Sequence, residues 1–237
     1  MPDDYLTLTP SEAPTFVAGT YRRVVLNRTL KAGYNSLSLP FNTTVEEIMG
    51  ADYDASTDWA AQLSIVTYNR QDGYSLYFEK SNEIAANQPY ILHIGTQKSS
   101  VVFKNVVLVN AVSAEQTATG GISNYSDWQM VSNYAVNFDM EGKYGIVNAD
   151  DCLKKGAAGS TLKAYTAYIV YNGAAPAQVK AAYLEEDEAD GLLRIVRGEG
   201  SGAEDVYDMQ GRKLPRSQRG INIIRGADGI VRKIINR

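Results

Sequence analysis

The sequence predicts an all-β protein: an antiparallel β-sandwich, of jelly-roll or immunoglobulin-like type, with one short helix and a small C-terminal β-hairpin region. Strand-like segments recur along the whole chain, about a dozen of them at intervals of roughly 8 to 15 residues. Only one segment carries helix signals. The chain also holds 16 Tyr against 5 Phe, which favours strands with one face partly exposed to solvent.

Composition shifts divide the chain into three regions. Residues 1–20 contain three of the seven prolines and are expected to form an extended lead-in. Residues 21–185 form the sandwich body, which a loop near 113–122 could split into two halves. Residues 186–237 are expected to be a linker followed by a basic C-terminal β tail. The boundary is placed at the acidic run that ends in Gly191, because such a run cannot be buried.

The clearest strand lies near the start of the body. Leu37, Leu39 and Phe41 alternate with Ser36 and Ser38, which is the two-residue period of a strand with different faces.

The single helix is expected directly afterwards, over residues 44–50. Thr44 can cap its first turn, and Glu47, three residues later, completes a capping box. Gly50 can end the helix. The apolar residues between them share one face, so this short helix should pack against one end of the sandwich.

Further strands follow at intervals typical of an antiparallel fold. Segments 63–68 and 74–78 read as a hairpin across the Asp-Gly turn at 72–73. The other expected strands span 21–30, 88–94, 101–112, 128–134, 142–147 and 162–171. Segment 162–171 is apolar on both faces, as is usual for a central strand.

The last thirty-odd residues form short strands separated by Gly-centred turns. Gly211 supplies a tight turn after Val206 and Tyr207, and Asp228-Gly229 predicts a hairpin between segments 221–225 and 230–235. The chain here resembles the C-terminal region of exported Bacteroidetes-group proteins, including type IX sorting tails. The matching residues are Tyr207, Asp208, Gln210, Gly211, Arg212, Gly220, Ile221 and Ile223. Asn222 stands where such tails often have Tyr, and a plain hairpin that closes a sheet is the alternative.

The resemblance implies an extracellular or cell-surface protein that meets an export machinery. Segments 37–41 and 88–92 are also similar to a β-module of surface proteins from the same bacteria. Residues 1–4 lack the basic and apolar regions of a secretion signal, so an exported protein would have had its signal ahead of residue 1. A cytoplasmic protein is the competing interpretation.

Charge and hydropathy exclude other classes. No apolar run reaches the roughly 18 residues of a membrane-spanning helix. The net charge is −4, yet residues 191–237 hold 10 Lys and Arg against 5 Asp and Glu. Because these basic residues are spread over several turns, nucleic-acid binding is not expected.

The acidic loop after the helix is a candidate metal site. Asp52, Asp54 and Asp58 stand with Ser56 at alternate positions, as calcium ligands do. An EF-hand is excluded, because Thr57 occupies the position of its invariant glycine. A looser surface calcium site or a solvated loop remains, and no other cofactor is expected.

Aromatic residues give the candidate ligand site. Trp59, Tyr74, Tyr77 and Trp128 could form a flat platform on which sugar rings stack. The alternative is that both Trp residues lie in the core.

No catalytic constellation is evident. His93 and Cys152 are the single residues of their types, and no pair among the 27 acidic residues is singled out. The favoured function is a non-enzymatic exported protein that serves in adhesion, structure or binding to a surface protein. A carbohydrate-binding module and a secreted hydrolase with paired carboxylates are the alternatives.

Overall fold

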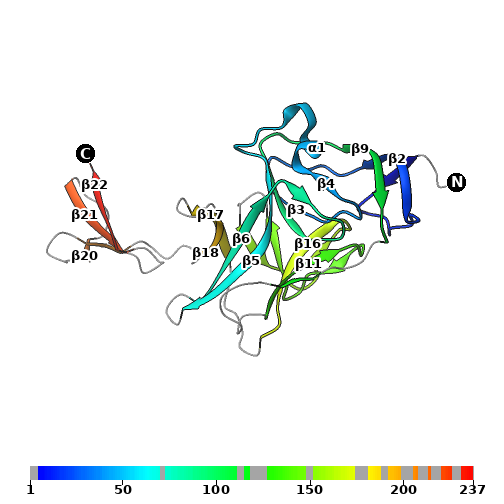
Figure 1. Cartoon of the computed structure of the whole chain (residues 1–237). Coiled ribbons are helices and arrows are strands. Elements are labelled where there is room, and N and C mark those ends of the chain that lie inside the picture. Colours follow the sequence, from blue (N-terminus) through cyan, green and yellow to red (C-terminus); the bar gives the residue numbers. More distant parts are fainter. Residues whose placement is uncertain are drawn as a thin grey trace.

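The fold is all-β, as predicted: several mainly antiparallel sheets and one α-helix make up the described part of the chain (Figure 1). The computed structural model describes residues 5–69, 73–110, 115–117, 127–147, 152–173, 181–187, 192–198, 205–207, 213–214, 220–225 and 231–236. Within these residues no helix has the length and apolar character needed to cross a bilayer.

The largest sheet has eleven strands. In spatial order they are β10 (Glu115–Thr117), β11 (Trp128–Asn133), β16 (Thr166–Tyr171), β13 (Tyr144–Val147), β14 (Cys152–Lys155), β17 (Ala181–Asp187), β18 (Leu192–Gly198), β6 (Gly73–Ser81), β5 (Trp59–Asn69), β8 (Tyr90–Ile94) and β3 (Gly33–Leu37). The sheet folds back on itself, because β3 contacts β13 and β16 while β5 contacts β10 and β11. Its two halves are therefore the two layers of a sandwich.

A hydrophobic core fills the space between these two layers. Trp128, Met130 and Tyr144 come from one half, and Leu63 and Phe78 come from the other. All five are almost fully buried. Because the first half of the body supplies one layer and the second half supplies the other, the two halves share this core and neither could bury it alone.

A third layer covers the outer side of β3 and β8. It consists of β1 (Tyr5–Leu8), β2 (Gly19–Leu26) and β9 (Val101–Leu108), in that order. A second core lies beneath it, where Leu37, Leu39 and Phe41 meet Phe103 as the alternating pattern predicts. The middle strands are thus buried on both faces.

The helix has the predicted boundaries. Helix α1 (Val45–Met49) begins after Thr44, whose hydroxyl accepts the Glu47 N–H at 3.0 Å while the Glu47 carboxylate accepts the Thr44 N–H at 3.2 Å. Gly50 ends it with a φ of 57°. The helix packs against β9 and leads into the one-turn 3-10 helix η1 (Gly50–Asp52). Two short ladders complete the body: β4 (Thr43–Thr44) with β7 (Glu83–Ile84), and β12 (Phe138–Asp139) with β15 (Thr161–Leu162).

Ser36 and Ser38, which alternate with Leu37 and Leu39, are also buried. Ser38 Oγ donates to Ser132 Oγ at 2.8 Å and lies 3.0 Å from the Tyr134 hydroxyl. Ser132 Oγ in turn donates to the Asn87 carbonyl at 2.9 Å. This chain of hydrogen bonds satisfies polar groups inside the sandwich, which would otherwise oppose folding.

Several boundaries differ from those expected, and three of the differences change the organisation of the fold. The lead-in contains β1, which pairs in parallel with β2 and buries Leu8. Segment 162–171 is two strands, because Tyr165 adopts a φ of 60° between them. The hairpin of β17 and β18 joins the main sheet through β6, so the body extends to Gly198 and the boundary at 186 is too early. The first residues of the acidic run, Glu185 to Asp187, lie in β17.

The tail forms its own sheet. Strands β19 (Asp205–Tyr207), β20 (Lys213–Leu214), β21 (Gly220–Arg225) and β22 (Val231–Asn236) are ordered β20-β19-β21-β22. The predicted hairpin pairs Ile221 with Ile235 and Ile223 with Lys233. Figure 1 draws these strands as a sheet distinct from the body.

Candidate functional site

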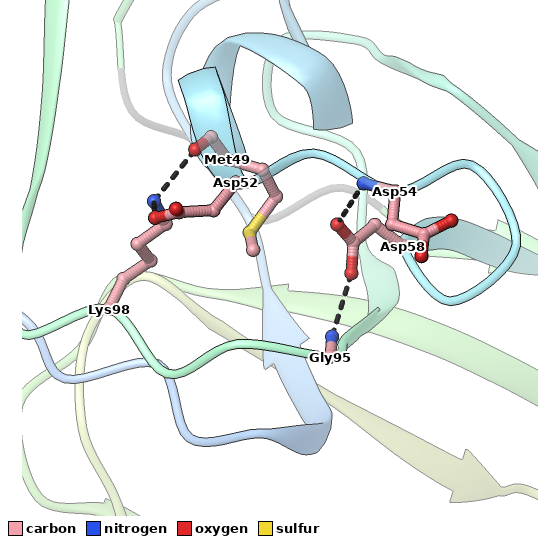
Figure 2. A network of polar contacts seen from close by, with 6 residues as sticks. All are labelled: Met49, Asp52, Asp54, Asp58, Gly95 and Lys98. Atoms are coloured by element: carbon pink, nitrogen blue, oxygen red, sulfur yellow. Dashed lines mark hydrogen bonds and ion pairs between the residues drawn. The ribbon is translucent and has the colours of Figure 1, made fainter.

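Two groups of predicted site residues lie around the loop between η1 and β5. The loop enters from the helix and leaves into Trp59, the first residue of β5. It packs against the end of β8, where the chain turns at Gly95. Figure 2 shows its acidic side chains and the groups they contact.

Asp54 stabilises the turn of this loop. Its Oδ1 accepts the Ser56 N–H at 2.9 Å and the Ser56 hydroxyl at 2.7 Å. Both hydrogen bonds favour the ionised carboxylate, so they lower the pKa of Asp54 below its usual value. The side chain bonds within its own turn, as Asp commonly does at such positions.

Asp58 fastens the loop to the neighbouring strand. Its Oδ2 accepts the Asp54 N–H at 2.8 Å, and its Oδ1 accepts the Gly95 N–H at 2.7 Å. Thr57 Oγ1 donates to Oδ1 as well, at 3.1 Å. Because Asp58 is only 3% exposed, these hydrogen bonds supply the donors that its enclosed carboxylate needs.

Asp52 belongs to a different contact. It forms an ion pair with Lys98 at 2.6 Å, and Lys98 also donates to the Met49 carbonyl at 2.7 Å. A cation there caps the C-terminal end of α1, where unpaired carbonyls attract positive charge. In Figure 2 this pair lies apart from Asp54 and Asp58.

The expected calcium site is therefore not formed by these residues. Asp52 pairs with a lysine, Asp54 bonds its own turn and Asp58 accepts backbone N–H groups, so their oxygens do not converge. No group of three or more His, Cys, Asp or Glu side chains able to hold a metal occurs in the described part of the chain. The alternately spaced Asp residues accept hydrogen bonds within the loop instead of forming a metal site. Asp side chains accept backbone N–H bonds as readily as they bind metals.

The aromatic platform is also not formed. Trp128 is fully buried and Trp59 is 8% exposed, and both belong to the core between the two layers. Tyr77 is half-buried on β6, and the side chain of Tyr74 lies outside those described. The prediction of exposed Trp residues is wrong because both begin strands whose inward faces meet across the sandwich.

Trp59 is instead enclosed by polar neighbours that the sequence did not indicate. The His93 ring stacks on it, with centroids 5.0 Å apart and an interplanar angle of 11°. Lys80 Nζ lies 4.5 Å from the Trp59 ring centroid. Tyr34 meets His93 edge-on at 4.7 Å. Strand pairing brings these residues together, since His93 is opposite both Trp59 and Tyr34.

His93 has a structural bond as well as this stacking contact. Its Nδ1 lies 2.6 Å from the Thr57 carbonyl oxygen, which can only accept, so Nδ1 carries the proton. The bond holds the same loop that Asp58 fastens. Within the described residues, the contacts of His93 therefore hold this loop in place. The side chain of Cys152 lies outside the described residues.

Arg28 is a half-buried cation that bridges two segments of the body. Arg28 donates from one guanidinium nitrogen to the Ser36 carbonyl at 2.8 Å and the Tyr165 carbonyl at 2.9 Å. Burial lowers the pKa of Arg28 to about 10, because a low-dielectric surrounding disfavours its charge. Its two bonds join β3 to the segment before β16, next to the break between strands at Tyr165.

The tail residues of the resemblance are partly described. Tyr207 lies on β19, and Gly220, Ile221 and Ile223 lie on β21. The remaining four, Asp208, Gln210, Gly211 and Arg212, lie outside the described residues. The turn they are predicted to form would connect β19 to β20, which pair in antiparallel fashion.

Comparisons with protein-family models, with curated proteins and with solved structures found no match for this chain. The class that the fold itself defines is an all-β sandwich with a third covering sheet and a small C-terminal sheet.

Proposed function

We propose that this chain is a non-enzymatic exported or cell-surface protein whose sandwich serves in adhesion, structure or binding, and whose C-terminal sheet is a sorting signal for export. The observation that carries the proposal is the organisation of the tail. Its four described strands pair only with one another, and its sequence carries the Tyr-Asp-x-Gln-Gly-Arg and Gly-Ile-x-Ile elements of type IX sorting tails.

The organisation of the body supports the same proposal. In the described part of the chain, β18 is the last strand that pairs into the main sheet, and the strands after it pair into a separate sheet. A signal that an export machinery recognises and cleaves should not contribute to the hydrophobic core of the exported protein. A tail with its own sheet meets that requirement.

The test is deletion of residues 199–237 from the full-length native gene. The cut must fall after Gly198, because an earlier one would remove β18 from the sheet. We expect the shortened protein to remain in the periplasm, while its melting temperature in purified form stays within a few degrees of that of the full chain. Protease accessibility on intact cells measures the first result, and circular dichroism measures the second.

A deletion of residues 188–237 is the matched control. It removes β18 as well, so it should fail to fold and show what loss of stability alone does to export. Surface display of the shorter deletion at the normal level would contradict the proposal. The glycan-binding alternative has lost its motivating residues, since neither Trp is exposed.

A further inference from the structure

The exposed apolar side chains of this protein gather on one sheet. Among the described residues, the large hydrophobic side chains that are strongly exposed are Tyr5 (60%), Val17 (71%), Val102 (41%), Val107 (60%) and Val109 (40%). All of them lie on β1 or β9, or within two residues of β2 or β9. Scattered exposed apolar residues are normal, but a cluster on one surface is typical of an interaction site.

Strand register places three of these side chains, Tyr5, Val102 and Val107, on the outer face of the β1-β2-β9 sheet. Tyr5, Arg23 and Lys104 are direct neighbours across the three strands, and all three are exposed. A second row, two residues along, contains Thr7, Val25 and Val102. Thr20 pairs with Val107 towards the other end. We call these three rows the outer face; the alternate residues of the same strands point into the core.

The outer face is positively charged on a protein of net negative charge. The three strands contain Arg22, Arg23 and Lys104 but no acidic residue, whereas the whole chain carries −4. A partner with acidic groups would gain favourable long-range attraction to Arg23 and Lys104 on this face. Apolar groups on the same partner could cover the valines.

We propose that the outer face is a docking surface for a partner protein that presents a segment of mixed acidic and apolar side chains. A protein segment fits better than an anionic polysaccharide, because four of the five exposed apolar residues are valines. Sugar rings stack on aromatic faces, and only Tyr5 offers one. Docking is assigned to the face and not to the edge of β9, because α1 packs against β9 and Asn105 interrupts its extended backbone with a φ of 53°.

The position of the outer face suits a surface-displayed protein. In Figure 1, β2 and β9 lie at the end of the body remote from β17 and β18, after which the chain continues to the tail. If the tail directs export as proposed above, the outer face lies at the end of the body remote from β17 and β18, the strands that precede the tail. The docking proposal itself does not depend on that delivery and is tested on the purified chain.

The experiment selects peptides on the purified full-length protein from a random twelve-residue display library. We expect the enriched peptides to combine Asp or Glu with apolar residues, and their affinity to fall as salt rises. Binding should weaken at least tenfold in an R23E/K104E variant and in a V102T/V107T variant. Thr keeps the β-branched shape that suits a strand, so the second variant tests apolar contact without disturbing the fold.

Lys31→Glu is the matched control, because Lys31 is an exposed cation outside the sheet; it should leave peptide binding unchanged. Three outcomes would overturn the proposal. One is a peptide selection that does not find this surface: either no acidic peptide is enriched, or the enriched peptides still bind both double variants. Another is binding of heparin or alginate that R23E/K104E abolishes and V102T/V107T does not. The third is a dimer in sedimentation that the valine substitutions dissociate.

Discussion

Replacing Asp58 with alanine tests whether the acidic loop is a structural clasp. The substitution removes the acceptors of the Asp54 and Gly95 N–H groups at a residue that is 3% exposed. A hydrogen bond to a charged group contributes about 1.5–3 kcal/mol, and the two N–H groups belong to exposed residues, so water can partly replace the lost acceptor. We therefore expect the free energy of unfolding to fall by roughly 2–4 kcal/mol, which lowers the melting temperature of a chain of this size by about 5–15 °C.

The assay is urea unfolding followed by circular dichroism, with and without calcium, on three parallel variants. Asp52→Ala breaks an exposed ion pair and should cost less than about 1 kcal/mol. Asp54→Ala removes bonds within an exposed turn and should also have a small effect. Calcium should change none of the midpoints. The clasp is refuted if Asp58→Ala costs no more than the other two, or if calcium stabilises the wild type and all three substitutions abolish that effect.

The remaining predictions concern the interior. Burial raises the pKa of Tyr165 to about 12, whereas its pKa in the unfolded chain is about 10. The folded state therefore keeps a proton that the unfolded state loses, and the free energy of unfolding declines by up to about 3 kcal/mol as the pH rises between these two values. Tyr165→Phe should make this decline shallower. An unchanged dependence of the free energy of unfolding on pH would contradict the prediction. Gly95→Ala places a Cβ 2.8 Å from Thr57 Oγ1 and should destabilise by about 1–3 kcal/mol, with partial rescue by Thr57→Ala; the absence of coupling between the two would show that the loop does not sit against Gly95. Ser132→Ala removes the hydrogen bond that Ser132 Oγ accepts from Ser38 and the one that it donates to the Asn87 carbonyl, and it should cost about 1–3 kcal/mol in thermal unfolding. A neutral result would mean that this buried chain of bonds adds nothing to stability.

Local signals predicted much of the fold. The capping box at Thr44 and Glu47 fixed the helix start, because its hydrogen bonds join residues only three apart. The alternation of Leu37, Leu39 and Phe41 correctly identified one face of the core. The Asp-Gly signals predicted the hairpins of β5 with β6 and of β21 with β22 for the same reason, because the conformation of a turn depends mainly on its own residues.

Features that depend on distant partners could not be predicted. Nothing in β1 indicates a parallel partner beyond a ten-residue connection. The acidic run suggested a linker, yet the strands on either side of it pair with each other and then with β6. Trp59 gave no sign of burial, because His93 and Lys80 reach it through strand pairing and packing. The spacing of the Asp residues suggested either calcium ligands or a solvated loop, and it did not predict the acceptor role of Asp58, which depends on Gly95, 37 positions away.

The most direct test of the account is whether the C-terminal sheet suffices for export. Residues 199–237 would be fused to the end of a periplasmic fluorescent protein in a Bacteroidetes bacterium that has a type IX system, and in a mutant of that bacterium without it. The account predicts fluorescence on the surface or in the medium of the first strain, and in the periplasm of the second. Retention of the fusion in the periplasm of both strains would contradict it.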